Sequence, residues 1–308
     1  VALPELKRFN YSGALATGSL AAGGTLGILI PPSVVLIIYA VMVEANVATL
    51  FQAAFIPGIL AALGYIAVIA IIVRINPKAG PAGERATRAQ KWTALLEIWP
   101  VLVIFILVMG GIYFGIFTPT EGAGIGAFGT FLIAITRGGM RLKGFTEALL
   151  GTAQTTAMIF LILLGAAIFN AFLGFSQLPI SAAEFFGNSG LSPHTILFGM
   201  IVLFIVLGFV MDSLSMIFLT IPIFWPIIAG LDFGMSPDEA KLWFGIIALI
   251  VVEMGLITPP VGLNVFIINS MAKDVPMIET FKGVIPFFAS DIIRVAVLIA
   301  FPTITLLV

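Results

Sequence analysis

The sequence predicts an all-α polytopic membrane protein that contains an inverted repeat, broken helices and a re-entrant hairpin. Two observations support this prediction: the composition, and a Pro-Pro motif that recurs in two long apolar stretches. Of the 308 residues, 60% are hydrophobic and only 9% are charged, whereas soluble domains carry roughly 25% charged residues. Stretches such as 59–73 and 101–108 are apolar on all sides, which favours helical spans over the alternating pattern of a membrane β-barrel.

The expected spans follow from the length of the apolar stretches, because a helix needs about 20 apolar residues to cross the hydrocarbon core. These spans are 12–43, 48–74, 98–117, 120–136, 147–175, 241–270 and 281–307. Basic residues gather at 7–8, 74–91 and 137–143, and the positive-inside rule places these segments in the cytoplasm. The segments 43–49 and 176–195 contain no Lys or Arg, so we expect them on the opposite side.

Two apolar stretches carry the same motif, GTLGILIPPS at 24–33 and MGLITPPVGLN at 254–264. With the charges assigned as above, the first stretch runs from inside to outside and the second from outside to inside. Each is followed by a short polar loop and then by a helix expected to begin with a proline, in FIPGIL (55–60) and GVIPFF (283–288). This arrangement predicts an inverted repeat.

Proline lacks an N–H group and clashes with the preceding helical turn, so each motif should interrupt its helix. Helices interrupted at corresponding positions of an inverted repeat are typical of secondary transporters, whose freed carbonyls and half-helix ends bind ions and substrate. The alternative is a pair of proline kinks that only bend their helices.

The stretch 195–229 consists of two apolar arms around the polar sequence MDSLSM (211–216). Arms of about 15 residues are short for full crossings, and both flanks are poor in basic residues. The pattern favours a re-entrant hairpin whose tip lies in the membrane near the second break. Two short crossings with a cytoplasmic turn satisfy the same pattern and stay open as an alternative.

Sodium is a hard cation that prefers oxygen ligands, and a broken helix frees backbone carbonyls for it. The hydroxyl of Thr258 lies one turn after Gly255, and the hairpin tip supplies further oxygens. The candidate sodium ligands are Gly24, Thr25, Gly27 and Ser33 at the first break, Gly255, Thr258 and Pro259 at the second, and Asp212, Ser213 and Ser215 in the hairpin. For the two serines the alternative is a hydrogen bond within their own helix.

Other polar residues in the apolar stretches are candidates for binding substrate, because ionisable groups within membrane spans are functional candidates by default. The candidate substrate ligands are Ser213, Asn264, Asn269, Asp291 and Arg294. The last two are three residues apart on one helix face, so they are also expected to pair with each other. Glu253 abuts the second break and is expected to tune it. Thr118 and Glu121 have the spacing of a capping box.

Four motifs in order, GTLGILIPPS, TPTEGAG (118–124), MDSLSM and EMGLITPPVGLN, make the chain resemble the large membrane (M) subunit of TRAP transporters, the tripartite ATP-independent periplasmic systems. The resemblance covers essentially the whole chain. It implies an elevator-type fold like that of the ion transporter superfamily, and sodium-coupled import of an organic acid such as sialic acid, a dicarboxylate or a sugar acid. It also implies a Ser-rich hairpin before Val1, so the chain is expected to be the later part of a longer subunit.

The family resemblance further implies a small membrane (Q) subunit and a periplasmic substrate-binding (P) protein as partners, and a multi-pass location in the bacterial inner membrane. Sodium (Na⁺) is the only cofactor expected, with no other metal and no nucleic acid. The expected organisation is residues 1–74 as the later part of the first repeat, 75–97 as an amphipathic cytoplasmic linker, 98–146 as scaffold-type spans and 147–308 as the second repeat. The last region contains the hairpin 195–229 and the broken helix 241–270.

Two other functions are compatible with parts of the sequence. One is an ion-coupled carboxylate permease of a related family that works without a binding protein. The other is an intramembrane aspartyl hydrolase, for which Asp212 and Asp291 are the candidate carboxylates, although neither lies in a GxGD motif. The chain has no Cys, and no His lies in an expected span, so cysteine, serine and zinc chemistries lack the residues they need. We therefore expect a transporter and no enzyme.

Overall fold

The protein is built from helices. The computed structural model describes residues 2–83 and 87–307, and in these ranges it contains helices, turns and no strand. The helices are α1 (Ala2–Arg8), α2 (Gly13–Leu29), α3 (Val34–Met42), α4 (Val47–Ile75), α5 (Arg88–Tyr113), α6 (Pro119–Thr136), α7 (Leu142–Ser176), α8 (Leu178–Gly187), α9 (Pro193–Leu207), α10 (Ser213–Ala229), α11 (Pro237–Ile257), α12 (Leu263–Met271), α13 (Met277–Ala300) and α14 (Thr303–Leu306). The prediction of an all-α chain is confirmed.

Several of these helices can cross a membrane. Within the described residues, α4, α5, α7, α11 and α13 are long and apolar enough, and the bent pair α2 and α3 adds a sixth span if it is counted as one. A polytopic membrane protein is therefore confirmed. The expected span 120–136 forms α6, which is not among these helices because Glu121 and several glycines lower the hydropathy of its first turns.

The chain divides into two compact units, Val1–Ala82 with Ala166–Val308 and Gly83–Gly165. The first unit contains both Pro-Pro motifs and the expected hairpin. In the second unit α5 packs against α6, and each of these helices begins with a capping box, Thr87 with Gln90 and Thr118 with Glu121. The capping box predicted at Thr118 is confirmed, while α5 begins earlier than the expected span 98–117 because Thr87 caps it.

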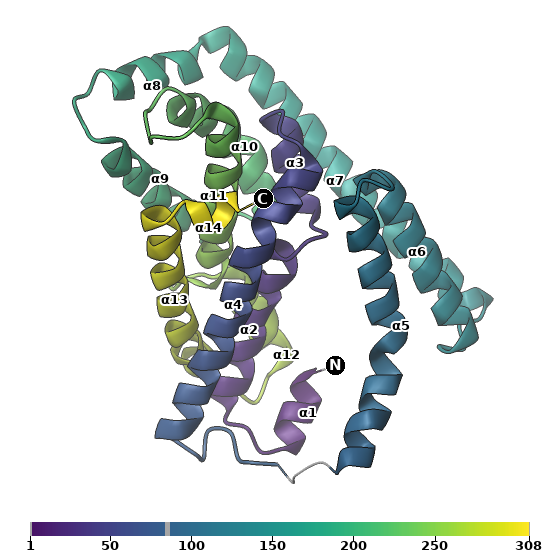
Figure 1. Ribbon diagram of the computed structural model, residues 1–308. Coiled ribbons are helices and arrows are strands. Elements are labelled where there is room, and N and C mark those ends of the chain that lie inside the picture. Colours follow the sequence, from purple (N-terminus) through teal and green to yellow (C-terminus); the bar gives the residue numbers. More distant parts are fainter. Residues whose placement is uncertain (1, 84–86, 308) are drawn as a thin grey trace. The chain divides into compact units, whose positions relative to one another are not determined.

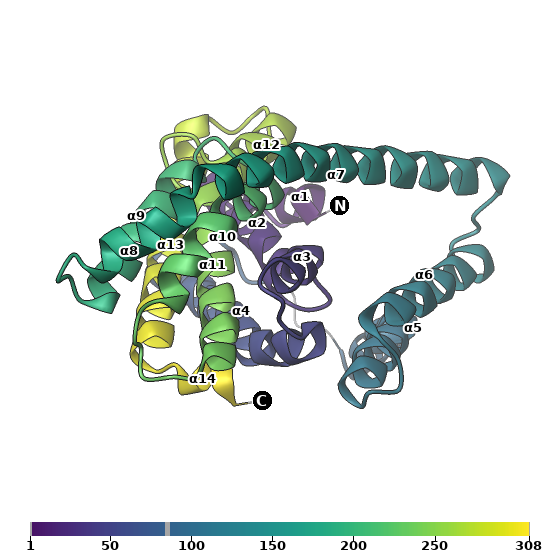
Figure 2. The ribbon, with the colours of Figure 1, turned by 90° about the horizontal axis from the view of Figure 1, so that it is seen from above.

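Helix α11 is the centre of the first unit (Figure 2). Every residue from Trp243 to Thr258 is buried, because α2, α3, α4, α9, α10 and α13 all contact this helix. The indole N–H of Trp243 donates a hydrogen bond to the carbonyl of Leu298 (3.0 Å). Since the part of α11 from Trp243 on is enclosed, any polar group in that part must find its partners inside the protein.

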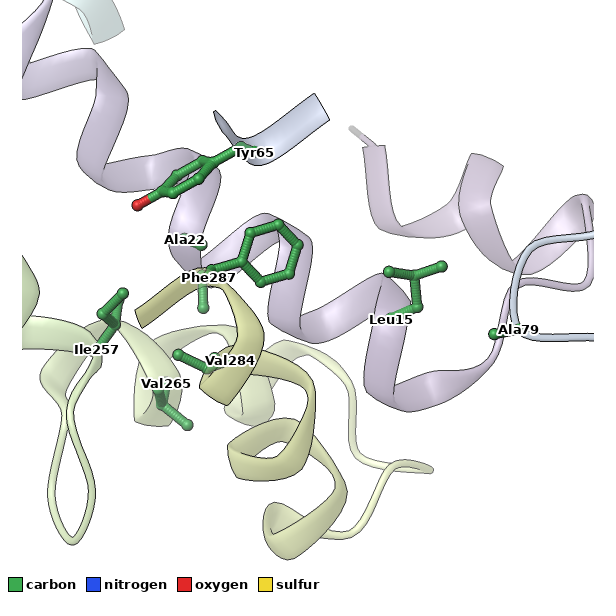
Figure 3. Close-up of a cluster of buried hydrophobic side chains, with 9 residues drawn as sticks. Leu15, Ala22, Tyr65, Ala79, Ile257, Val265, Val284 and Phe287 are labelled. Atoms are coloured by element: carbon green, nitrogen blue, oxygen red, sulfur yellow. The ribbon is translucent and has the colours of Figure 1, made fainter. Parts of the chain in front are cut away.

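Helices α2, α4 and α13 run beside one another (Figure 1). Between them and the two halves of the second broken helix lies a cluster of buried side chains (Figure 3). The cluster includes Leu15, Ala22, Tyr65, Ala79, Ile257, Val265, Val284 and Phe287. The Tyr65 and Phe287 rings meet edge to face with centroids 5.2 Å apart. In a membrane such close packing, rather than exclusion of water, holds helices together, so this cluster fixes the two broken helices against each other.

Both Pro-Pro motifs interrupt their helices, as predicted. Helix α2 ends at Leu29, Pro31 and Pro32 follow, and α3 starts again after Ser33 at an angle of 46°. Helix α11 ends at Ile257, and α12 starts at Leu263. Proline disfavours helical geometry in the residue before it, which explains why Ile30 and Thr258 are extended.

The second break ends in a glycine that a side chain would strain. Gly262 has φ +61°, a backbone conformation that only glycine adopts at low cost. It is the residue before α12 and turns the chain back into a helix. The two Pro-Pro peptide bonds are cis.

One detail of the predicted repeat is wrong. Helices α4 and α13 do not begin with the prolines of FIPGIL and GVIPFF, because Pro57 and Pro286 lie inside them. The side chain of Asn46 accepts hydrogen bonds from the backbone N–H groups of Ala48 and Thr49 and so starts α4 earlier. Prolines inside membrane helices are tolerated when neighbouring helices and local adjustments satisfy the freed groups.

Candidate functional site

The end of α9 lies directly against the second break. Gly208 and Gly255 approach so closely that a Cβ atom on Gly208 would lie 2.6 Å from the Cα atom of Gly255. Real Cβ atoms do not come this close to a backbone atom, so this contact requires glycine at Gly208. The prediction that the tip of the hairpin lies near the second break is confirmed.

Helices α9 and α10 form the two arms of the expected hairpin, with 15 and 17 residues. At about 1.5 Å per residue they are shorter than the roughly 30 Å of a hydrocarbon core. Their lengths are consistent with a re-entrant hairpin, whose position in the membrane stays a prediction.

The close approach brings two polar side chains together. Ser213, the first residue of α10, donates a hydrogen bond from its hydroxyl to Oε1 of Glu253 in α11 (2.6 Å). Both residues are buried, and Glu253 is only 3% exposed. Its second oxygen, Oε2, has no hydrogen-bond partner among the described residues. Sequence reasoning did not count Glu253 among the ligands, although its place beside the break is a usable signal.

Asp212 and Ser215 lie at the same tip but serve the helix itself. The Asp212 carboxylate caps α10, accepting hydrogen bonds from the backbone N–H groups of Leu214 and Ser215 (3.0 and 3.1 Å). It also accepts one from the Ser215 hydroxyl (2.5 Å). Asp212 is exposed, so the structure separates it from the buried pair formed by Ser213 and Glu253.

At the second break itself, Thr258 is buried and donates its hydroxyl proton to the carbonyl of Met254 (2.5 Å). Its backbone N–H donates to the carbonyl of Gly255 (3.1 Å). Pro259 is exposed. Because the Thr258 proton points back along α11, the lone pairs of its oxygen stay available for another ligand.

The four candidate ligands at the first break are less enclosed. Gly24 and Gly27 are exposed, whereas Thr25 and Ser33 are buried. Ser33 caps α3 by accepting a hydrogen bond from the backbone N–H of Leu36 (3.4 Å). Thr25 donates its hydroxyl proton to the carbonyl of Ala22 (2.6 Å), and Thr258 likewise donates to a carbonyl of its own helix.

Thr25 also begins a buried polar network that reaches α13. Its hydroxyl oxygen lies 3.3 Å from that of Tyr65, and the Tyr65 hydroxyl donates to Oδ2 of Asp291 (2.7 Å). Arg294 places Nη2 2.9 Å from Oδ1 of Asp291, so the predicted pairing of these two residues is confirmed. Sequence reasoning missed Tyr65, since nothing near it in the chain distinguishes it from an ordinary apolar-face tyrosine.

The two candidate asparagines of α12 have different surroundings. Asn269 donates from Nδ2 to the carbonyl of Val275 (2.9 Å) and to the hydroxyl of Thr280 (3.0 Å), which ties α12 to the start of α13. Asn264 is half-buried, and its Nδ2 atom lies 3.9 Å from the position that a Cβ on Gly24 would take. Asn264 is therefore the candidate that links the two breaks.

These groups suit a hard monovalent cation better than a transition metal. The described residues contain no cluster of three or more His, Cys, Asp or Glu side chains that would hold a metal ion. Hydroxyl, carbonyl and carboxylate oxygens are the ligands that hard cations prefer. Among these groups, Oε2 of Glu253 is a buried carboxyl oxygen without a hydrogen-bond partner in the described ranges.

Comparison with known proteins identifies a transporter family that matches nearly the whole chain. The family model for the DctM component of the tripartite ATP-independent periplasmic transporter matches residues 1–304. This match covers both breaks and the hairpin between them.

Individual relatives are about a third identical to this chain over the aligned residues. A Pseudomonas aeruginosa protein named C4-dicarboxylate TRAP transporter large permease protein DctM is 33% identical over 99% of this chain and 70% of its own length. A Vibrio cholerae protein named sialic acid TRAP transporter large permease protein SiaM is 30% identical, again over 99% and 70%. The DctM protein of Rhodobacter capsulatus is 32% identical over 89% of this chain, which spans only 64% of that relative.

Proposed function

Since this chain belongs to the DctM family of tripartite ATP-independent periplasmic transporters, a family of transporters rather than enzymes, we propose that it imports a small organic acid together with sodium. The observation that carries this proposal is the placement of two interrupted helices, each with a buried threonine, in one compact unit. Thr25 and Thr258 both donate their protons to their own helices. Each oxygen therefore keeps lone pairs that can bind a cation, and that of Thr25 also lies 3.3 Å from the Tyr65 hydroxyl.

Arg294, which keeps two nitrogens without a partner beside its pair with Asp291, supports a carboxylate as the substrate class. This residue is buried, and its Nε and Nη1 atoms have no hydrogen-bond partner among the described residues. A guanidinium group binds a carboxylate through two parallel N–H donors. The relatives named above are described as transporters of C4-dicarboxylate and of sialic acid, which are both carboxylates. We therefore propose a carboxylate substrate, with Ser213 and Asn264 as further contacts.

The transport step that we propose is of the elevator type, in which the broken helices and the hairpin move together through the membrane. The grouping of both breaks and the hairpin in one compact unit supports this division of labour, and 98–146 would supply the static scaffold. The proposed partners are a small membrane subunit and a periplasmic substrate-binding protein, in the bacterial inner membrane. Crosslinks that hold the broken helices to the scaffold should abolish transport, so full activity in their presence would contradict this step.

Uptake by the full-length subunit, reconstituted with its partners in proteoliposomes, tests the function. We expect accumulation that requires a sodium gradient and selects one member of a panel of sialic acids, dicarboxylates and sugar acids. Replacing sodium by choline at equal ionic strength is the control. Equal uptake in both salts would refute sodium coupling.

The second candidate function is an ion-coupled carboxylate permease that needs no binding protein. It shares the sodium and carboxylate chemistry proposed for Thr258 and Arg294 and differs in taking up its substrate without a periplasmic protein. Uptake measured with and without the periplasmic protein separates the two functions, because only the permease accumulates free substrate alone.

A further inference from the structure

Glu253 is a buried carboxyl group that has no cationic partner among the described residues. It lies in the fully buried part of α11, and no ion pair within the described ranges includes it. The buried charged groups on the neighbouring α13 are Asp291 and Arg294, which pair with each other, whereas Glu279 and Lys282 of this helix are not buried. Tyr65 on α4 donates to Asp291 rather than to Glu253. An isolated buried charge is costly, so a charged Glu253 requires a positive partner.

We propose that Glu253 is the anionic ligand of a monovalent-cation site formed with Ser213 at the contact between the hairpin and the second break. This inference rests on the sodium coupling proposed above, and it adds a residue that supplies the negative charge of the site. The unpartnered oxygen Oε2 faces the cation, while Oε1 accepts the hydroxyl proton of Ser213.

The hydrogen bond to Oε1 also prepares Ser213 as a ligand. A hydroxyl group has one proton and two lone pairs. Because the Ser213 proton is held by Glu253 (2.6 Å), both lone pairs of its oxygen are directed elsewhere. In the same way, carboxylates that hold the proton of a metal-ligating side chain fix its orientation.

The charge of the site selects the class of cation. A single carboxylate balances one positive charge, and the described residues offer no group of three acidic, His or Cys side chains that would hold a metal ion. Sodium satisfies this balance without leaving a net charge inside the helices. The site also joins two elements, since Ser213 belongs to α10 and Glu253 to α11, so cation binding should hold the hairpin on the second break.

Sodium-dependent thermal stability of the purified full-length complex tests the proposal without measuring transport. A ligand that binds only the folded protein raises its unfolding midpoint as the ligand concentration increases. We would measure the midpoint at constant pH and ionic strength while sodium replaces choline. The Glu253→Gln variant keeps an oxygen for Ser213 but removes the charge, and we expect its half-maximal sodium concentration to rise at least tenfold.

Thr220→Val is the matched control, because the buried Thr220 hydroxyl bonds only the carbonyl of Met216 in its own helix. This variant should keep the wild-type sodium response. An unchanged response in Glu253→Gln, with a sodium-sensitive wild type, would overturn the inference and leave the proposed function standing. It would mean that Glu253 is a neutral structural acid.

A wild-type complex that is insensitive to sodium would overturn both proposals. If Glu253→Gln does not yield folded protein, Ser213→Ala decides the question, because it removes a ligand oxygen from the same site and leaves the Glu253 charge in place. We expect the sodium requirement of Ser213→Ala to rise by about tenfold or more, which corresponds to roughly 1.4 kcal/mol. An unchanged requirement would exclude Ser213 from the site and overturn the inference.

Discussion

The two broken helices have similar sequences but differ in what packs against them and in how their charges are balanced. The first break, between α2 and α3, leaves Gly24 and Gly27 exposed, and the polar network that begins at Thr25 ends in the ion pair of Asp291 with Arg294. The second break leaves Pro259 exposed but packs its α11 side against α9 and α10, and its carboxyl group, Glu253, has no cationic partner in the described ranges.

This difference teaches that a Pro-Pro interruption does not by itself make an ion site. The interruption frees backbone groups in both helices, but the surrounding elements decide whether the nearby charges are already satisfied. In the network that begins at the first break, Arg294 balances the charge of Asp291 from within the protein. At the second break no described cation lies on Glu253, and its oxygen Oε2 is left for a ligand.

The largest effect should follow from replacing Arg294, the positively charged residue in the network that begins at Thr25. Arg294→Met leaves Asp291, which is 2% exposed, without its partner, and breaking a buried ion pair costs about 3–5 kcal/mol. We expect a large drop in the thermal midpoint of the purified complex. The double variant Asp291→Asn with Arg294→Met should recover much of the loss, because no buried charge is left unpaired. A double variant as unstable as the single one would contradict the charge-balance argument.

The next largest effect tests the packing at the two breaks. Gly208→Ala places a Cβ atom 2.6 Å from the Cα atom of Gly255, and such overpacking typically costs about 1–3 kcal/mol. Gly27→Ala at the first break meets nothing within 4 Å. In the interior of a helix this change should stabilise the protein by roughly 0.5–1 kcal/mol. Equal thermal midpoints for the two variants in sodium-free buffer would show that the breaks are packed alike.

A smaller effect concerns the hydroxyl of Thr258. Thr258→Val removes one oxygen at the second break with little change in size. If that oxygen contacts sodium, the half-saturating sodium concentration for uptake should rise about tenfold, or roughly 1.4 kcal/mol. If the hydroxyl serves only its bond to Met254, the half-saturation stays constant. Initial uptake rates across a sodium series, at equal protein insertion, distinguish the two, and Thr220→Val is again the control.

The smallest effect involves a surface contact between the segment before the first broken helix and the segment after the second. Lys7, before the first broken helix, donates a hydrogen bond to Asp274, after the second. This bond lowers the pKa of the Asp274 carboxyl below its ordinary value, so the contact stabilises the protein above the ordinary pKa of about 3.9. The stabilisation is lost as the pH falls through the lowered pKa of the folded state.

The thermal midpoints of Lys7→Met and wild type should therefore differ slightly near neutral pH and converge in acid. Because both side chains are substantially exposed, added salt should screen the difference at neutral pH as well. A difference that persists at the lowest pH would assign the effect of Lys7 to packing instead of charge.

Local features of the fold were predictable because their causes lie close together in the chain. The apolar stretches specify helices, the Pro-Pro motifs specify where α2 and α11 end, and the spacing of Asp291 and Arg294 places both side chains on one face of α13. The capping box of Thr118 with Glu121 is equally local. Each depends on hydrogen bonding or sterics within a few residues.

Helix starts were predicted less well where several signals compete. Pro57 suggests the start of a helix, yet Asn46 caps α4 further upstream. A proline is compatible with both a first turn and the interior of a membrane helix, so its presence alone does not decide between them.

By itself, the sequence determined the helical membrane fold, the two interruptions and the closeness of the hairpin tip to the second break. Only the tertiary structure decided which polar groups meet. Ser213 and Glu253 are separated by 40 residues, and Tyr65 and Asp291 by 226, so no local pattern links them. Which partner each finds depends on how α4, α10, α11 and α13 pack. That packing is set by shape complementarity across the whole unit, as in the approach of Gly208 to Gly255.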